Sequence, residues 1–159
     1  MNDFKNIGIQ KIVLFRLNES QYALYLSAVE RVIRASEITP LPKAPKIILG
    51  IINFHGEIIP VVDIRKRFNL FSRELKLEDR FIIARTSKRL VVLVVDSVEG
   101  VYELEHHRII AAKEAFPFTD YISGAAKIET NIVLINDLEK FLSLDEEKIL
   151  SQALSGVTE

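Results

Sequence analysis

The sequence of 159 residues contains no cysteine and no long hydrophobic run. Without cysteine, the chain can form neither disulfides nor thiolate metal sites. The longest apolar run, Leu90–Val95, is far shorter than the roughly 20 residues that a membrane-spanning helix needs. The first ten residues include no apolar core of signal-peptide length. These absences predict a cytoplasmic protein that does not insert directly into a membrane.

The chain also lacks an excess of charge of either sign. It has 21 basic and 22 acidic residues, so its formal net charge is -1. Such a balance gives no basic surface for nucleic acid or anionic lipid. With 48% hydrophobic and 27% charged residues, the composition is that of a globular domain, and the length fits one domain or two small subdomains.

Valine, isoleucine and leucine occur in short runs separated by polar turns, which predicts a mainly β fold with short helices. The tail is predicted to be helical over about 143–155, because Ser143 and Glu146 have the spacing of a capping box. The predicted strands are Lys11–Leu17, Tyr22–Leu26, Ile48–Phe54, Ile58–Ile64, Phe81–Arg85, Leu90–Val95 and Ile132–Ile135.

Two parts of the sequence resemble each other at a nearly constant separation in residue number. Nine residues between Gly50 and Leu70 have counterparts 74 positions later, beginning with Gly124. The Val-x-x-Val segments at 29–32 and 98–101 are similar at a distance of 69. Two β units of roughly 70 residues would explain both similarities. Chance alignment of short apolar strands is the alternative.

No arrangement for catalysis is visible: the chain has no phosphate loop, dinucleotide fingerprint or Gly-x-Ser-x-Gly motif. Asp63 and Asp137 each follow an apolar strand, where an acid is expected to cap the next turn. Of the histidines, His106 and His107 would point to opposite faces of a strand, and no partner near His55 completes a metal site. We therefore expect no enzyme, no metal and no cofactor.

The region 49–65 predicts two apolar strands joined by a tight turn at His55-Gly56-Glu57, where Gly56 suits a positive φ. This pattern indicates a turn presented to a partner. It resembles the signature of the CheW-like family, the adaptor proteins of bacterial chemotaxis. The residues that match that signature are Gly50, Asn53, Gly56, Pro60, Asp63 and Arg65. His55 stands where the family usually has arginine, and Phe54 where it usually has leucine.

The resemblance runs from about Lys11 to about Leu154 and implies the fold: two small SH3-like, five-stranded β-barrels packed side by side. We expect one CheW-like domain over 1–159. Within it, the first subdomain would cover about 11–80, with the C-terminal helix of about 143–155 able to pack back on it. The second subdomain would cover about 81–142.

The resemblance also implies the function, a non-catalytic adaptor that couples methyl-accepting chemoreceptors to a CheA-type histidine kinase. The expected partners are the regulatory domain of the kinase and the cytoplasmic tip of the receptor, in arrays at the inner face of the membrane. The isolated chain is expected to be monomeric. One alternative is a related adaptor in a non-flagellar pathway such as twitching, gliding or surface sensing. A different alternative is a small-barrel nucleic-acid binder, which the net charge opposes.

In the family, the valines that match Val29 and Val101 lie near a groove between the barrels that receives the receptor tip. The simpler interpretation is that all the valines of both segments are core residues. Arg31 stands where the family usually has glutamate. The expected partner-binding residues are Val29, Arg31, Val32, Asn53, Phe54, His55, Gly56, Glu57, Val98 and Val101.

Overall fold

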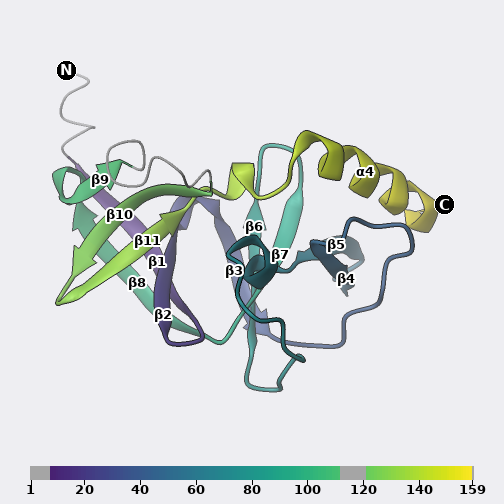
Figure 1. Cartoon of the computed structure of the whole chain (residues 1–159), viewed down its shortest axis with the longest axis horizontal. Helices are drawn as coiled ribbons and strands as arrows, with labels where there is room; N and C mark the ends of the chain where they lie inside the picture. Colours follow the sequence, from purple (N-terminus) through teal and green to yellow (C-terminus); the bar gives the residue numbers. More distant parts are fainter. Residues whose placement is uncertain (1–7, 112–120, 159) are drawn as a thin grey trace. The chain divides into compact units, whose positions relative to one another are not determined.

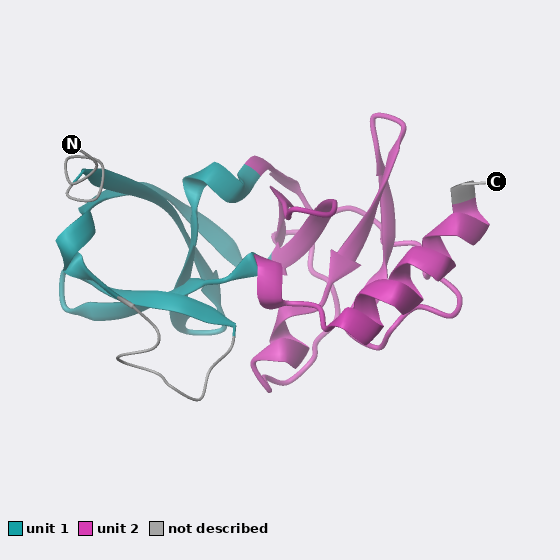
Figure 2. Cartoon of the chain, turned by 90° about the horizontal axis from the view of Figure 1, so that it is seen from above, with its two compact units in different colours: residues 1–29, 95–138 teal, residues 30–94, 139–159 magenta. Residues whose placement is uncertain are grey.

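The computed structural model describes residues 8–111 and 121–158, and it is mainly β, with two sheets and a C-terminal helix (Figure 1). The chain forms two compact units, each built from two separate segments (Figure 2). Unit 1 contains residues 1–29 and 95–138, and unit 2 contains residues 30–94 and 139–159. The mainly β fold with a C-terminal helix, expected from the sequence, is confirmed.

Unit 1 holds a six-stranded sheet in the order β8-β1-β2-β11-β10-β9. Its buried core includes Ile12, Leu14, Ala23, Val133 and Ile135. Its strands are β1 (Ile9–Leu17), β2 (Ser20–Tyr25), β8 (Ser97–Glu105), β9 (Ile109–Ala111), β10 (Ile122–Ile128) and β11 (Asn131–Asn136), with the 3₁₀ turns η1 (Leu26–Ala28) and η2 (His106–Arg108).

Unit 2 holds a five-stranded sheet in the order β3-β6-β7-β5-β4. Its core includes Ile52, Val61, Phe81, Val92 and Val94. Five consecutive residues of β7 are buried, as expected for a strand that is apolar on both faces. Its elements are β3 (Val29–Arg34), β4 (Ile48–Phe54), β5 (Glu57–Val62), α2 (Ile64–Arg67), β6 (Arg80–Arg85), β7 (Leu90–Val95) and α4 (Leu144–Thr158), with η3 (Leu138–Lys140) leading into α4.

The internal repeat is confirmed by the strand registers. In the β4–β5 hairpin Gly50 lies opposite Val61, after a register shift from Ile48. The β10–β11 hairpin has the same shift, with Gly124 opposite Ile135. Each of these pairs lies 74 residues from its counterpart. Chance alignment of apolar residues would not reproduce a bulge at the same place in both hairpins.

The expected division of the chain near residue 80 differs from the structure. The β1–β2 hairpin belongs to the sheet of β8, β10 and β11, whereas the β6–β7 hairpin belongs to the sheet of β3, β4 and β5. Short parallel pairings join the halves: Ala23 lies opposite Ile135, and Val92 opposite Val61. Each unit thus combines the first part of one repeat with the second part of the other. A sequence period locates the repeats but does not tell which halves pair.

The seven predicted strands are present, but four others were missed. Strands β3 and β8 were missed because both expose residues on each face and so lack apolar alternation. The missed β10 contains Gly124, Ala125 and Ala126, which are small residues with weak strand preference. Strand β9 has only three residues. The predicted capping box of α4 is confirmed, since the N–H of Ser143 donates to Glu146 Oε1 and the N–H of Glu146 donates to Ser143 Oγ.

Candidate functional site

The turn between β4 and β5 has the geometry that the sequence predicted. His55 and Gly56 have φ values of 52° and 87°, and two consecutive positive φ angles are typical of the tight turns that close β-hairpins. Asn53 Oδ1 accepts a hydrogen bond of 2.9 Å from the N–H of Gly56. Apart from the half-buried Phe54, residues 53–57 are exposed. The turn is therefore held in shape by its own residues and is presented to solvent.

The side chain of Arg31 reaches this turn from β3. Its guanidinium carbon lies 5.6 Å from the centroid of the Phe54 ring, within the range of a cation–π contact. The Phe54 and His55 rings meet edge to face, with centroids 4.2 Å apart and planes at 75°. Strands β3 and β4 stand at opposite ends of the strand order, so the sheet must curl strongly to bring these side chains together. We call Arg31, Asn53, Phe54, His55 and Gly56 the turn cluster.

The four valines of the Val-x-x-Val segments are not fully buried. Val101 and Val32 are 54% and 38% exposed, whereas Val29 and Val98 are half-buried. The interpretation that all four are core residues is therefore wrong.

A register shift in β8 explains how two valines three residues apart share a face. Val98 lies opposite Phe15 and Val101 lies opposite Val13, and the shift falls between them. Phe15 and Val13 are two residues apart on β1 and point the same way. The bulge thus places Val98 and Val101 on the sheet face away from Leu14, which points into the core of unit 1.

Sequence reasoning missed a buried group of charged residues in unit 2. Asp63, Arg65 and Asp79 are 7%, 4% and 1% exposed, and they line a cavity of about 270 Å³. Asp63 Oδ1 accepts from the N–H groups of Arg65 and Lys66, which confirms its expected role as the cap of α2.

Asp79 is held on two sides. Its carboxylate accepts two hydrogen bonds from Arg73, of 2.9 and 2.7 Å, and one of 2.8 Å from the N–H of Lys76. Burial alone would raise the pKa of Asp79, but these hydrogen bonds and the charge of Arg73 outweigh it and lower the pKa below the ordinary value. The carboxylates of Asp63 and Asp79 therefore both have structural roles: one caps α2, and the other binds Arg73 and the backbone of Lys76.

The histidines lie in the β4–β5 turn and in η2. His106 and His107 lie in η2, not on a strand as the sequence analysis assumed. Nε2 of His107 is 3.2 Å from a carboxylate oxygen of Glu105, and Nδ1 of His106 is 3.4 Å from Nε2 of Gln10. Within residues 8–111 and 121–158, no three histidines or acids come together in a way that could hold a metal ion.

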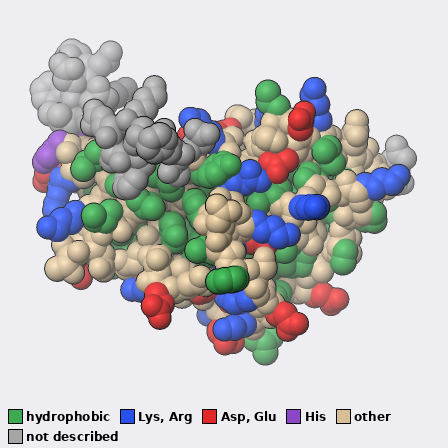
Figure 3. All heavy atoms as spheres, viewed as in Figure 1, with side chains coloured by type: hydrophobic (Ala, Val, Ile, Leu, Met, Phe, Trp, Pro, Cys, Tyr) green, Lys and Arg blue, Asp and Glu red, His purple; other side chains and the backbone are tan. Residues whose placement is uncertain are grey.

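The surface shows two further features. On the face of the molecule seen in Figure 3, basic and acidic side chains are interspersed, so this face carries no broad basic surface of the kind that a nucleic-acid binder needs. Among the described residues, no helix has the length and apolar character required to cross a bilayer.

Comparison with known proteins gives a consistent result over most of the chain. A model of the CheW-like domain matches residues 11–146. The chemotaxis protein CheW of Thermotoga maritima is 30% identical over 132 residues, which cover 83% of this chain and 87% of that protein. The CheW protein of Treponema pallidum is 25% identical over 142 residues, which cover 86% of this chain and 84% of that protein.

A solved structure agrees with these sequence matches. The crystal structure of the scaffolding protein TtCheW from Thermoanaerobacter tengcongensis superposes with a TM-score of 0.79 and 31% identity, covering 87% of this chain and 96% of that one. The family-model match over residues 11–146 includes both hairpins of the internal repeat and the turn cluster. The chain therefore belongs to the CheW-like family.

Proposed function

We propose that this protein is a non-catalytic scaffold of a chemosensory array, which couples chemoreceptors to a CheA-type histidine kinase at the inner face of the membrane. The observation that carries the proposal is that a CheW-like domain, whose relatives are chemotaxis and scaffolding proteins, fills most of the chain. The mechanism is geometric: the scaffold holds kinase and receptor in register, so that a change in the receptor alters the activity of the kinase.

The turn cluster and the exposed valines are the proposed docking residues. A hydrogen bond and two ring contacts within unit 2 hold the turn in its shape, and a preorganised surface loses little entropy on binding. Val32 and Val101 supply exposed apolar contacts of the kind that bind the apolar face of a helical hairpin. Glu57 follows the turn cluster of unit 2 in sequence, and Val29 and Val98 are half-buried valines of unit 1; we include all three among the proposed docking residues.

The first prediction is saturable binding of the full chain to the regulatory domain of the CheA-type kinase from the same cell. We expect one-to-one binding with a Kd in the micromolar range, about -8 kcal/mol, measured by isothermal titration calorimetry. The control is the nucleotide-binding domain of the same kinase, which should not bind. Absence of binding at about 100 μM would contradict the proposed kinase partner while leaving the family assignment intact.

A second candidate function is a CheW-like scaffold of a non-flagellar pathway, favoured by the composition of the turn cluster. The family usually has glutamate at position 31 and arginine at position 55. Here Arg31 stacks on Phe54 beside His55, so an ion pair between the two positions is replaced by contacts through an aromatic ring. Imidazole also lacks the forked donors with which guanidinium binds a carboxylate. We infer that this surface selects a receptor different from the usual chemotaxis receptors.

The double variant Arg31→Glu and His55→Arg tests this inference. We expect it to bind the tip of a typical flagellar chemoreceptor about fivefold more tightly than the wild type, because a guanidinium at position 55 has the forked donors that bind a receptor carboxylate, a surface contact worth about 1 kcal/mol. Binding to immobilised receptor tips would be measured by surface plasmon resonance. The matched control, Arg108→Glu with His107→Arg, makes the same charge changes on η2 of unit 1 and should not alter the affinity. Equal affinities of wild type and double variant would contradict the inference.

A further inference from the structure

The two units have the same kind of ion pair at equivalent positions. In unit 1 Arg16 on β1 pairs with Glu99 on β8. In unit 2 Arg85 on β6 pairs with Glu30 on β3 at 2.9 Å. Arg85 lies 69 residues after Arg16, and Glu99 lies 69 residues after Glu30. Equivalent positions of the two units can therefore be compared residue by residue.

In unit 2, helix α4 lies against the turn of the β6–β7 hairpin. Arg89 Nη2 donates to Ser151 Oγ at 2.8 Å and to Glu147 Oε2 at 3.1 Å. The turn residue Ser87 donates from its N–H and its hydroxyl to the carboxylate of Glu139, in the segment that leads into α4. A basic hairpin turn is thus covered by a helix with acidic residues, and Leu150 of that helix is fully buried.

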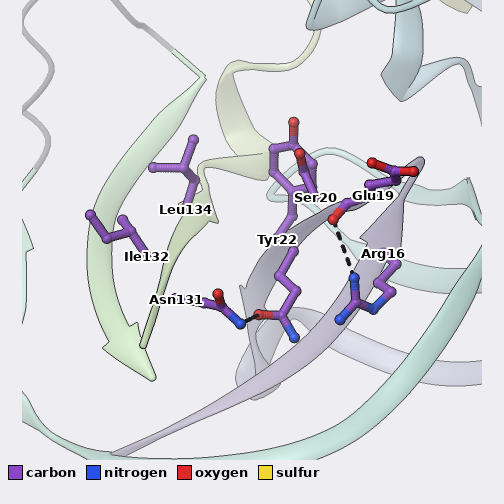
Figure 4. A pocket seen from close by; sticks show the side chains of 8 residues that line it. Arg16, Glu19, Ser20, Tyr22, Asn131, Ile132 and Leu134 are labelled. Carbon is purple, nitrogen blue, oxygen red and sulfur yellow. Dashed lines mark hydrogen bonds between the residues drawn. The ribbon is translucent and has the colours of Figure 1, made fainter. Parts of the chain in front are cut away.

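In unit 1, the equivalent hairpin turn borders an open cavity of about 450 Å³ (Figure 4). Glu19 and Ser20, the counterparts of Lys88 and Arg89, line it. The residues that line the cavity are Arg16, Glu19, Ser20, Gln21, Tyr22, Asn131, Ile132 and Leu134. In the part of unit 1 that the structure describes, the helical segments η1 and η2 have three residues each, so no helix like α4 covers this place.

The cavity combines an exposed apolar side chain with a fixed polar rim. Ile132 is 67% exposed, whereas its counterpart Ile58 in unit 2 is half-buried. Asn131 Nδ2 donates to Gln21 Oε1 at 3.2 Å, and Gln21 Nε2 donates to Glu99 Oε2 at 2.9 Å. In Figure 4, the cavity-lining residues Ile132 and Leu134 on β11 lie to the left, and Tyr22 and Arg16 lie to their right.

The hairpin turn that lines the cavity carries an acidic residue where the turn beneath α4 is basic. Arg16, which also lines the cavity, is paired with Glu99. Lys88 and Arg89 of unit 2 are replaced in unit 1 by Glu19 and Ser20. Counted over the sequence, unit 1 has six basic and ten acidic residues, a formal charge of -4, whereas unit 2 has 15 basic and 12 acidic residues, a formal charge of +3. An occupant complementary to this rim would carry basic residues where α4 carries acidic ones.

We propose that the cavity between β2 and β11 is a docking site for a partner protein's amphipathic helix, which places an apolar residue against Ile132 and a basic residue beside Glu19. The helix would lie on unit 1 as α4 lies on unit 2. This site is separate from the turn cluster, which belongs to unit 2, so it would serve a further partner of the scaffold.

The test uses the full chain and a peptide that copies α4 with its charges reversed. The probe is the 15-residue sequence of α4 with Asp145→Lys, Glu146→Lys and Glu147→Lys. NMR titration of the ¹⁵N-labelled protein should shift the amide signals of Glu19, Ser20 and Ile132. The variant Ile132→Glu should weaken binding at least tenfold. The matched control Ile110→Glu, at a 51% exposed position of β9, should change the affinity less than twofold.

A charge reversal in the protein gives a second test. A misfolded variant could not produce its result, because binding of one peptide should become stronger. Glu19→Lys should weaken binding of the lysine peptide and strengthen binding of the unmodified α4 peptide, each about fivefold. Three results would overturn the proposal: no binding of the lysine peptide at about 1 mM, equal binding by wild type and Ile132→Glu, or shifts confined to Ser87 and Arg89 at the α4 site. A concentration-dependent dimer abolished by Ile132→Glu would also overturn it in favour of a second copy as the occupant.

Discussion

Replacing Gly50 with alanine is expected to lower the free energy of unfolding by about 3 kcal/mol. The added Cβ would clash with the carbonyl oxygen of Thr39 and lie 2.9 Å from the carbonyl carbon of that residue. Thr39 cannot move aside, because it exchanges two backbone hydrogen bonds with Ile51, of 2.9 and 2.8 Å. The φ of Gly50, 154°, is also one that side-chain-bearing residues rarely adopt. The segment at Thr39 thus pairs with the outer edge of β4, the strand that leads into the turn cluster.

Thermal unfolding followed by circular dichroism measures this effect, which should appear as a fall in melting temperature of about 10 °C. Gly156→Ala is the matched control, since no atom lies within 4 Å of the added Cβ and the residue sits in α4. It should raise stability by about 0.5–1 kcal/mol. Gly124→Ala should again be destabilising, because its Cβ would lie 2.8 Å from the carbonyl oxygen of Ile110. A cost below about 1 kcal/mol for Gly50→Ala would show that this edge can relax.

The same glycines show how far the sequence could predict the fold. Gly50 and Gly124 were among the residues that revealed the 74-residue repeat, and they occupy equivalent bulges of two different hairpins, β4–β5 and β10–β11. Strong local signals of this kind, such as the turn at Gly56 and the capping box at Ser143, predicted the local structure correctly. Which half of one repeat pairs with which half of the other depends on the parallel contacts of β2 with β11 and of β5 with β7. Each contact consists of only two residue pairs, too few to leave a signal in the sequence.

The candidate site was partly predictable for the same reason. The turn residues Asn53 to Glu57 form a local hairpin, so their exposure and backbone geometry could be predicted from the sequence. The stacking of Arg31 on Phe54 joins residues 23 positions apart on the two end strands of a curled sheet, and no local pattern indicates it. The cavity near Ile132 also combines two distant segments. The 69-residue similarity offered a signal for it, because it pairs Glu19 with Lys88 and so predicts a change of charge between equivalent turns.

Asp79→Asn is the second change expected to be strongly destabilising, by about 3 kcal/mol at pH 7. The carboxylate is 1% exposed, and the neutral amide cannot accept both hydrogen bonds of Arg73 or balance its charge. The backbone carbonyl of Asp79 also accepts a 3.1 Å hydrogen bond from the N–H of Ala35, just after β3. Disorder of the backbone at Asp79 should therefore also disorder β3, the strand that carries Arg31 and Val32. Chemical denaturation of the wild type and the variant measures the difference.

The pH dependence of this stability difference shows whether the variant is destabilised by loss of the Asp79–Arg73 ion pair or by poorer packing. Because the pKa of Asp79 is lowered in the folded state, its contribution is fully present above the unfolded value of about 4 and is lost as the pH falls through the folded value. The difference between wild type and Asp79→Asn should thus shrink as the pH falls below about 4. Glu146, whose pKa is also lowered, titrates in both proteins and cancels in the comparison. A difference that is the same at pH 3 and pH 7 would mean that shape, and not charge, makes Asp79 necessary. In that case Gly50→Ala and Asp79→Asn would destabilise the protein for the same reason, a poor steric fit. Gly50 is needed for steric reasons where a loop meets the unit 2 sheet.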